Sequence, residues 1–255
     1  MGKRVQDFLV TENKRLKKDI CILELSSPEP LPEMRPGQFV QIRVDESPGT
    51  FLRRPFSLHD VNYRKNRIRL LVQVVGNGSR ALYDLNNGDL LNIVYPLGNS
   101  FSAPSPEDKI ILIGGGSGVA PLLFLARELD QLGFKPDILL GFRSAERVIG
   151  QNEFGKFGTV LITTEDGSEG EKGFVTDHSA LKNNSYNRIY CCGPDPMMKA
   201  VAGYARTGNI FCEVSLENLM GCGFGICLCC IVHTTRGNIC TCTEGPVFNI
   251  KDLKW

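Results

Sequence analysis

The sequence has almost no net charge, because 29 lysine and arginine residues balance 28 aspartate and glutamate residues over 255 positions. A protein that neutralises many nucleic-acid phosphates needs a basic excess, so we expect no nucleic-acid partner. Long apolar runs are also missing. The longest uncharged stretch, 110–126, contains four glycines and a proline and is shorter than the ~20 apolar residues that span a bilayer. We therefore expect no membrane segment.

Histidine is scarce, and the three histidines (His59, His178 and His233) offer no pair near the cysteines that a Rieske-type cluster would need. No apolar leader follows Met1–Arg4, so we expect a cytoplasmic protein. Cysteine, by contrast, is abundant: there are ten, and six of them lie between residues 222 and 242. In a reducing compartment such cysteines serve metals, clusters or catalysis rather than disulfides.

The first part of the chain, residues 1–103, alternates short apolar runs with turn-forming residues. The runs are 20–25, 39–44, 68–75 and 90–94. Regularly spaced short strands of this kind predict a small antiparallel β-barrel or β-sandwich, of which we expect the barrel.

After the proline-rich stretch 103–106 the rhythm becomes strand, glycine turn, helix and strand, which predicts a parallel α/β domain over residues 104–212. From residue 213 to 255 the sequence is rich in glycine and cysteine and has too little apolar periodicity for a helix-packed core. This last segment is a candidate metal module, so the predicted fold class is multi-domain β plus α/β with a small C-terminal domain.

A glycine-rich turn follows the first strand of the α/β domain and opens its helix. It contains Gly114, Gly115, Gly116 and Gly118 and ends at Pro121. Glycines at this position let backbone N–H groups approach a pyrophosphate at a helix N-terminus. The G-x-G-x-x-G pattern fails at its last glycine, so an ordinary strand-to-helix turn is the alternative.

A second motif is predicted to follow a barrel strand. In it an arginine could clamp a phosphate, an aromatic ring could cover a flavin and a serine could donate to a flavin nitrogen. Its residues are Arg54, Pro55, Phe56 and Ser57. The turn at Gly78 and Ser79 would bring backbone donors to the same diphosphate. Solvated arginines beside a hairpin turn are the alternative.

The cysteine pattern of the last segment is the most specific signal. Cys222, Cys227 and Cys230 follow the x4 and x2 spacing of plant-type 2Fe-2S proteins, and Cys242 is placed to be the fourth ligand. Zinc held by Cys227, Cys230, Cys240 and Cys242 is the alternative. The 2Fe-2S assignment leaves Cys229 and Cys240 without a role as ligands, and we expect them to be small buried residues.

A fourth motif, Cys192-Gly193-Pro194, ends a predicted parallel strand at the carboxyl edge of the sheet, where α/β proteins bind ligands. Taken alone it is as well explained by a turn with a core cysteine.

The order of these motifs resembles that of ferredoxin-reductase-type flavoproteins. The segments 215–225 and 242–248 resemble, more narrowly, the electron-transfer subunits of NAD-dependent dihydroorotate dehydrogenase B. The resemblance covers essentially the whole chain. It implies an NAD-linked oxidoreductase of pyrimidine (UMP) biosynthesis, in which an FMN-containing catalytic subunit passes electrons through a 2Fe-2S cluster and FAD to NAD. It also implies a heterotetramer of two subunits of each kind.

By this resemblance, Ser57 and Cys192 are the catalytic residues. The FAD-binding residues would be Arg54, Pro55, Phe56, Ser57, Leu71, Val72, Gln73, Gly78 and Ser79. The NAD-binding residues would be Gly114, Gly115, Gly116, Gly118, Pro121, Cys192, Gly193 and Pro194. The metal ligands would be Cys222, Cys227, Cys230 and Cys242.

Two other functions remain open at this point. One is the flavin and iron-sulfur subunit of a ferredoxin:NAD(P) or sulfide-linked reductase complex, and the other is a zinc-stabilised nucleotide-binding sensor. Nicotinamide preference is open as well, since Arg143 and Ser144 could meet a ribose 2′-phosphate, although we predict NAD.

Overall fold

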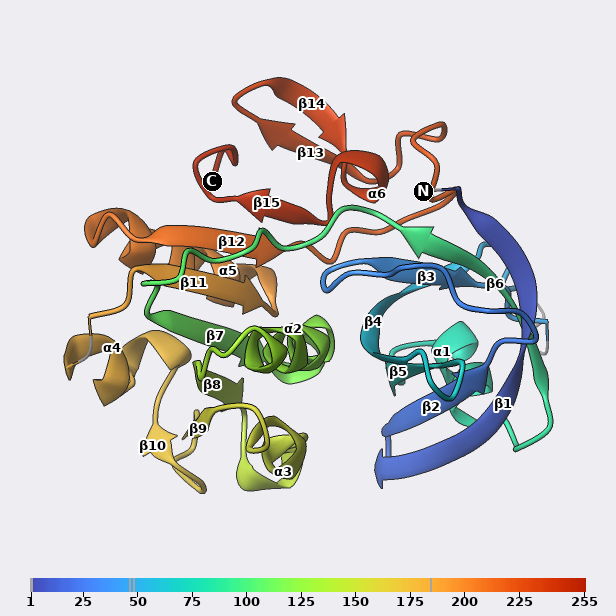
Figure 1. Cartoon of the computed structure of the whole chain (residues 1–255), viewed down its shortest axis with the longest axis horizontal. Helices are drawn as coiled ribbons and strands as arrows, with labels where there is room; N and C mark the ends of the chain where they lie inside the picture. The colour runs from blue at the N-terminus through green and yellow to red at the C-terminus, as the bar shows by residue number, and fades with distance from the viewer. Residues whose placement is uncertain (1, 46, 48, 184) are drawn as a thin grey trace.

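The N-terminal part of the chain is a closed antiparallel barrel with the strand order β1-β2-β5-β4-β3-β6 (Figure 1). The structure is a computed structural model that describes residues 2–45, 47, 49–183 and 185–255. The barrel strands are β1 (Arg4–Lys17), β2 (Ile20–Ser26), β3 (Phe39–Ile42), β4 (Arg54–Asn62), β5 (Arg67–Gln73) and β6 (Leu90–Leu97).

Alternation along the strands fills the barrel, since every second side chain points inward. On β3, Val40 and Ile42 join the barrel core, whereas Phe39 belongs to a separate apolar cluster outside it. The short helix α1 (Asn77–Tyr83) adds Leu82 and Tyr83 to the same core.

The α/β region is a sheet of order β10-β9-β8-β7-β11-β12-β15, parallel except for the last strand. Its strands are β7 (Ile110–Gly115), β8 (Asp137–Phe142), β9 (Thr159–Thr164), β10 (Glu171–Lys172), β11 (Arg188–Cys192), β12 (Phe211–Ser215) and β15 (Val247–Asn249). Its helices are α2 (Ala120–Gln131), α3 (Gln151–Phe154), α4 (Ser179–Asn183) and α5 (Asp195–Thr207), with 3-10 turns η1 (Gly116–Val119), η2 (Ala145–Arg147) and η3 (Val175–Asp177).

The sheet is covered on both faces, which explains why its strands are apolar without interruption. Ile110 and Leu112 of β7 pack with α2, while Ile111 and Ile113 of the same strand pack with α5. No helix in the described part of the chain is long and apolar enough to cross a bilayer.

Helix α2 also packs against barrel strand β4 and joins the two regions. Arg127 of α2 lies 2.5 Å from the Asp60 carboxylate and donates to the Val61 carbonyl. Nearby, both terminal nitrogens of Arg69 bind the Glu153 carboxylate, at 2.7 and 3.0 Å. Partly buried, geometrically matched pairs of this kind fix orientation more than they add stability.

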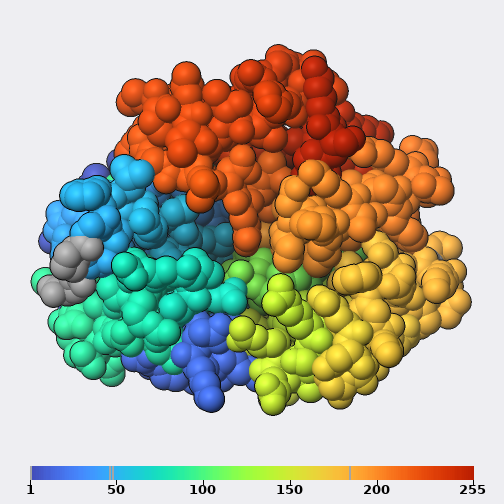
Figure 2. All heavy atoms as spheres, turned by 180° about the vertical axis from the view of Figure 1, so that it is seen from behind, coloured from blue at the N-terminus to red at the C-terminus, as the bar shows by residue number. Residues whose placement is uncertain are grey.

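The C-terminal segment adds the hairpin β13 (Ile231–Thr234) and β14 (Gly237–Cys240) and the turn α6 (Thr241–Glu244). Strand β12 runs across the predicted boundary at residue 212, and β15 returns to pair with it, so the segment is continuous with the sheet. From behind, Figure 2 shows it lying across both the barrel and the α/β region. The three domain ranges stay a prediction.

Asn99, just after the last barrel strand, ties this segment down. Its side-chain nitrogen donates to the carbonyls of Glu244 and Val247, and its side-chain oxygen accepts from the Val247 N–H. The barrel and the C-terminal segment are therefore connected directly, in addition to the long covalent path through the sheet.

The predicted fold class is confirmed: an antiparallel barrel, a parallel α/β sheet and a small C-terminal module. Several strands were not predicted, among them β1, β4 and both strands of the C-terminal hairpin. β1 has 14 residues and alternates charged and apolar positions so weakly that only Phe8 and Val10 are buried.

Candidate cofactor sites

The glycine-rich turn lies where the sheet meets α2. Strand β7 ends at Gly115, the 3-10 turn η1 follows, and Pro121 sits in the first turn of α2, where its missing N–H costs nothing. A Cβ added to Gly118 would stand 2.4 Å from the Cα of Gly193. Only two glycines allow the turn and the loop after β11 to approach this closely.

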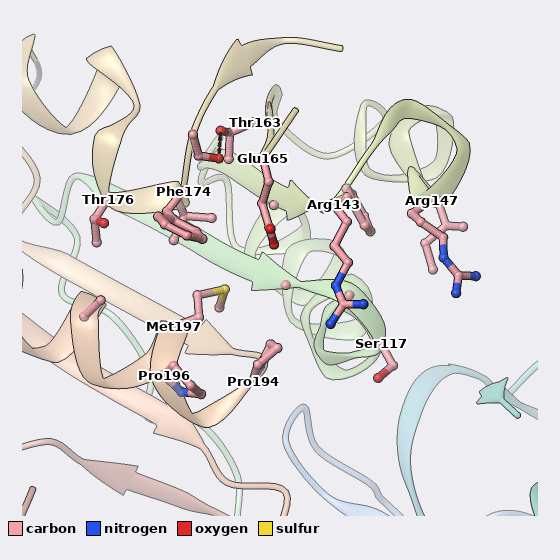
Figure 3. A pocket seen from close by; sticks show the side chains of 18 of the residues that line it. Ser117, Arg143, Arg147, Thr163, Glu165, Phe174, Thr176, Pro194, Pro196 and Met197 are labelled. Atoms are coloured by element: carbon pink, nitrogen blue, oxygen red, sulfur yellow. Dashed lines mark hydrogen bonds between the residues drawn. The ribbon is translucent and has the colours of Figure 1, made fainter. Parts of the chain in front are cut away.

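A cavity of 630 Å³ opens over this turn, between the carboxyl edge of the sheet and the barrel (Figure 3). Gly115, Gly116, Ser117 and Pro194 line it from the sheet side. From the barrel side it is lined by Ile20 and Gln73. The carboxyl edge of a parallel sheet is the usual ligand site of such folds, and the volume suits a dinucleotide portion.

Two charged side chains enter the cavity from neighbouring strand ends. Arg143 follows β8 and Glu165 follows β9, and Figure 3 shows both extending into the open space. Arg147 also lines the cavity, but its guanidinium lies 2.6 Å from Asp19 of the barrel. The outer end of the site therefore offers both a cation and an anion to a ligand.

Cys192 ends β11 at the inner end of this edge and is buried. Burial, followed by the nearby Glu217 carboxylate, raises the pKa of Cys192 well above its ordinary value, although a hydrogen bond from Ser215 opposes the shift. The thiol is therefore neutral at physiological pH. It can pack against a ring but is not a nucleophile.

Glu217 lines the cavity just after β12 and was not assigned to it from the sequence. Solvent reaches its side chain through the cavity, yet desolvation by the surrounding protein raises the pKa of its carboxyl group. The only available signal was its position as the first carboxylate beyond a parallel strand, because ligand-binding side chains gather at that edge.

The predicted flavin motif begins β4 itself rather than following a strand. Arg54, Pro55, Phe56 and Ser57 are all partly accessible. A Cβ on Gly78 would lie 3.2 Å from the Arg54 Nε, so these two predicted positions are adjacent in space. The Ser79 hydroxyl is occupied, because it accepts from the N–H groups of Val75 and Gly76 at the start of α1.

The three predicted residues of β5 lie on two opposite faces of the strand. Gln73 lines the cavity and Leu71 packs on the α/β side, whereas Val72 is fully buried in the barrel core. Strand alternation leaves Val72 only its backbone groups for any ligand.

The cysteine loop has no regular secondary structure between residues 221 and 230 and is organised by bonds to sulfur. The Cys222 Sγ accepts from the N–H groups of Phe224 and Cys227, at 3.3 and 3.5 Å, and the Cys242 Sγ accepts from Gly225 at 3.2 Å. The Cys230 Sγ accepts from Cys242 at 3.4 Å. Backbone N–H groups aimed at sulfur are what a thiolate-bound cluster needs.

Two of these thiols are strongly perturbed, in opposite directions: burial raises the pKa of Cys242 to about 12, whereas the pKa of Cys222 shifts downward. Burial opposes the ionisation of Cys222, but backbone hydrogen bonds from Cys227, Phe224 and Ile226 outweigh it and lower the pKa of this thiol to about 6. Metals bind the thiolate form, so the loop is prepared for metal binding. The described part of the chain contains no group of three or more His, Cys, Asp or Glu side chains that could share a single metal ion.

The loop is seated on the outside of the barrel. Phe39 of β3 and Val94 and Leu97 of β6 form one apolar cluster with Met220, Cys230 and Cys242. Cys227 and Cys229, by contrast, are exposed, so the expectation that Cys229 is buried is wrong, and Cys240 is only partly buried. Two of the four predicted ligands therefore lie against the barrel wall, and the loop's outer edge faces solvent.

Comparisons with known proteins bear on each of these regions. Family models match an oxidoreductase FAD-binding domain at residues 7–101 and an oxidoreductase NAD-binding domain at residues 112–203. The iron-sulfur cluster binding domain of dihydroorotate dehydrogenase B matches residues 217–254.

A relative from Fusobacterium nucleatum, the electron transfer subunit of dihydroorotate dehydrogenase B (NAD(+)), is 34% identical over 259 residues, which cover 98% of this chain and 99% of its own. The chain belongs to this family of electron transfer subunits. A member of the family from Geobacillus kaustophilus is 37% identical over 227 residues, 87% of this chain and 88% of its own.

Solved structures agree with this family assignment. The NADH-dependent reduced ferredoxin-NADP oxidoreductase, described in a study of flavin-based electron bifurcation, has a TM-score of 0.88 at 30% identity and covers 97% of this chain and 90% of that one. The ferredoxin reductase of carbazole 1,9a-dioxygenase has a TM-score of 0.72 at 22% identity, over 82% of this chain and 67% of that one, and shows the shared fold.

As a member of the electron transfer subunit family, the chain is an NAD-linked oxidoreductase. The predicted cofactors FAD, NAD and an iron-sulfur cluster are confirmed by the three domain matches. The match over residues 217–254 favours the cluster over zinc. The family name also implies a catalytic partner. The individual site residues stay predictions.

Proposed function

We propose that this chain carries electrons from the FMN of a dihydroorotate-oxidising partner subunit, through a 2Fe-2S cluster and FAD, to NAD in pyrimidine biosynthesis. Barrel strand β3 supports this order most directly. It contacts the cysteine loop through Phe39, while its neighbour β4 carries the flavin motif. The next strand, β5, reaches the cavity through Gln73. A flavin held by β4 would thus lie between the cluster and the nicotinamide.

Each residue then has a defined task. Arg54 binds the FAD diphosphate beside Gly78, and Phe56 covers the flavin. The backbone of Ser57 pairs with Phe39 of β3, but its hydroxyl makes no hydrogen bond within the described residues and is available to the flavin ring. FAD, when bound, would take up electrons one at a time from the cluster and give a hydride to NAD, which links a one-electron cluster to a two-electron carrier.

On the nicotinamide side, Gly114–Gly118 present backbone N–H groups to the pyrophosphate, and the close contact of Gly118 with Gly193 positions that turn. Neutral Cys192 packs against the nicotinamide ring. Glu217, with its raised pKa, faces the same space.

The structure supports NAD rather than NADP. Glu165 places a carboxylate in the cavity beside Arg143, at the strand ends that approach an adenosine ribose. A carboxylate accepts hydrogen bonds from a ribose diol and repels a 2′-phosphate. Arg143 can then bind the pyrophosphate.

The four cysteines divide into two contact pairs, which suits a cluster with two irons that each need two thiolates. The Cys222 N–H donates to the Cys227 Sγ at 3.4 Å, and the Cys242 N–H donates to the Cys230 Sγ. We assign one pair to each iron.

The partner would dock over the exposed edge of this loop. Leu219, Ile226 and Leu228 are 84%, 81% and 57% exposed, which is unusual for large apolar side chains so close together in sequence. A dimer of the catalytic subunit would then carry one copy of this chain on each side, as a cytoplasmic heterotetramer.

The first experiment is the visible spectrum of anaerobically purified protein before and after NADH is added. Flavin and iron-sulfur bands that both bleach support the proposal, and orotate formed from dihydroorotate on mixing with the FMN subunit completes it. Flavin bands alone, with zinc in place of iron, would contradict it. For docking, the double variant Ile226→Ala and Leu228→Ala should lose the complex, whereas Leu132→Ala, equally exposed at the end of α2, should keep it.

A second candidate is the flavin and iron-sulfur subunit of a ferredoxin:NAD(P)-type reductase, which the likeness to the NADH-dependent ferredoxin-NADP oxidoreductase favours. Reduction of ferredoxin by the purified chain and NADH, without any response to the dihydroorotate-oxidising subunit, would select this function instead.

A further inference from the structure

One buried polar side chain of the barrel has no partner. Gln41 of β3 is 0% exposed, and neither its Oε1 nor its Nε2 makes a hydrogen bond. Among the residues that the structure describes, no other side chain has both of its polar atoms buried and unpaired. An amide left in this state costs a few kcal/mol, about 1–3 by mutational measures, so it indicates a missing partner.

Gln41 lies on the outer face of the barrel. Val40 and Ile42, its neighbours in the strand, point into the barrel core, and Phe39 shares its face. That face is the one on which Cys230 and Cys242 are seated. Strand alternation therefore directs the unpaired amide toward the cysteine loop and away from the barrel interior.

The contact with the loop is direct. A Cβ added to Gly223 would lie 2.9 Å from the Cδ of Gln41 and 3.0 Å from its Oε1 and Nε2. Gly223 also has φ +77°, which disfavours any other residue. The glycine between Cys222 and Phe224 thus leaves room for the Gln41 amide to lie flat against the loop.

We propose that the side-chain amide of Gln41 is a hydrogen-bond donor to the sulfur atoms of the iron-sulfur cluster, and that it raises the cluster's reduction potential. The inference rests on the proposed cluster ligands Cys222, Cys227, Cys230 and Cys242. Hydrogen bonds to sulfur stabilise the more negative reduced state, so their number sets the potential.

The position of Gln41 relates the cluster's reduction potential to electron transfer with the flavin. In the sheet register Gln41 pairs with Pro55 of the flavin motif, so the same residue lies between the two electron carriers. Gln41 is a positioning residue: it would hold the cluster against the barrel at the point nearest the flavin and adjust the driving force of the single-electron step.

The first test replaces Gln41 by methionine, which has a similar shape and cannot donate. Iron, acid-labile sulfide and an EPR-monitored redox titration are measured on the anaerobic protein. We expect unchanged iron and sulfide, and a ratio of reduced to oxidised cluster at fixed potential that falls about tenfold, which is 59 mV for a one-electron couple. An unchanged potential in a fully loaded variant would overturn the inference.

Gln38 provides a matched control three residues away. Its Nε2 already donates to the Gly98 carbonyl and its Oε1 accepts from the Arg35 N–H, so it has nothing left for the cluster. The Gln38→Met variant should keep the wild-type potential. An equal shift in both variants would mean a general disturbance of the barrel wall and would count against Gln41.

A second measurement uses wild-type protein, so it does not require that the Gln41→Met variant assembles its cluster. Wild-type protein labelled with ¹⁵N in glutamine side chains, then reduced, is examined by pulsed EPR. A ¹⁵N coupling to the cluster supports the inference, and its absence overturns it. Absence of iron and sulfide from the wild-type protein itself would instead remove the proposed function, so the two failures are distinguishable.

Discussion

Two glycine-rich turns of this chain are assigned to cofactors, and they are built in opposite ways. The turn 114–119 joins a buried strand to a helix, and its Gly118 packs directly against the Gly193 backbone. The loop 221–230 has neither helix nor strand, and its backbone N–H groups point at cysteine sulfurs. The protein alone organises the first, whereas the second is organised around the group that it binds.

We expect the largest effect from a variant of the cysteine loop that leaves the glycine-rich turn 114–119 intact. Cys242→Ser removes a proposed ligand that is buried against the barrel, so bound iron and sulfide should fall more than about tenfold. Bleaching of the flavin by NADH should persist, because the cavity does not depend on the cluster. Iron analysis and visible spectra check both expectations.

Cys229 is the control for that variant, since it lies in the same loop and is exposed. Cys229→Ser should keep its full iron content. Loss of iron in Cys229→Ser, or retention in Cys242→Ser, would show that the ligand assignment is wrong.

The second variant changes the turn 114–119 and leaves the cysteine loop intact. Gly118→Ala places a Cβ 2.4 Å from the Gly193 backbone, which cannot move aside as a flexible side chain could. Overpacking of this kind costs about 1–3 kcal/mol, so the affinity for NADH should fall about tenfold or more while iron content is unchanged. A titration of NADH against the flavin spectrum measures this.

Gly203 of α5 is the matched control, because a Cβ added there meets nothing within 4 Å. Gly203→Ala should bind NADH normally. If Gly118→Ala bound NADH as tightly as Gly203→Ala, the close approach would have no part in the site.

A finer test concerns the outer end of the cavity. Glu165→Gln removes the charge that would repel a 2′-phosphate and leaves Arg143 in place. The ratio of kcat/KM for NADPH to that for NADH should rise about tenfold, close to the 1.4 kcal/mol of one weak charge contact. Glu169→Gln, in the same loop but outside the cavity lining, should not alter the ratio. An unchanged ratio in Glu165→Gln would remove the carboxylate from cofactor selection.

The last test concerns the junction on which the cavity depends. His59 is fully buried and its Nδ1 lies 2.9 Å from the Ala120 carbonyl, at the start of α2. Burial lowers the pKa of His59 to about 4, below the ordinary 6.5. Below pH 6.5 the unfolded chain therefore binds a proton that the folded chain refuses, and stability falls toward pH 4 by up to about 1.4 kcal/mol per pH unit.

Melting temperatures of the wild type and of His59→Asn between pH 7.5 and 5 check this. The asparagine cannot be protonated, so its stability should vary less with pH. The exposed His233 serves as control, and His233→Asn should behave as the wild type. Parallel pH profiles for the wild type and His59→Asn would rule out this role.

The same contrast explains how far the sequence could predict the molecule. Apolar runs such as 110–113 and 188–192 become buried strands because a doubly covered sheet requires them, and the turn between strand and helix follows from its glycines. The cysteine spacing predicted the cluster because ligand geometry is set by the metal and needs no knowledge of the fold.

Contacts between distant segments could not be predicted in this way. Gln41 reads as an ordinary polar residue in a strand, and only the seating of the C-terminal segment on β3 gives it a neighbour in Gly223. Glu217 likewise reaches the cavity through the course of β12. The flavin motif was predicted to follow a strand, but it lies within β4. The prediction failed because a proline, here Pro55, argues against a strand.

The side chain of Asn99 restricts motion between the barrel and the α/β region. Two regions joined by one linker are free to hinge, and motion between them is the ordinary expectation. Here the last segment pairs with the sheet through β15 and is fastened to the barrel by Asn99, so it acts as a strap across the joint. The segment that carries the proposed cluster ligands is therefore also the one that keeps the barrel and the sheet at a constant distance.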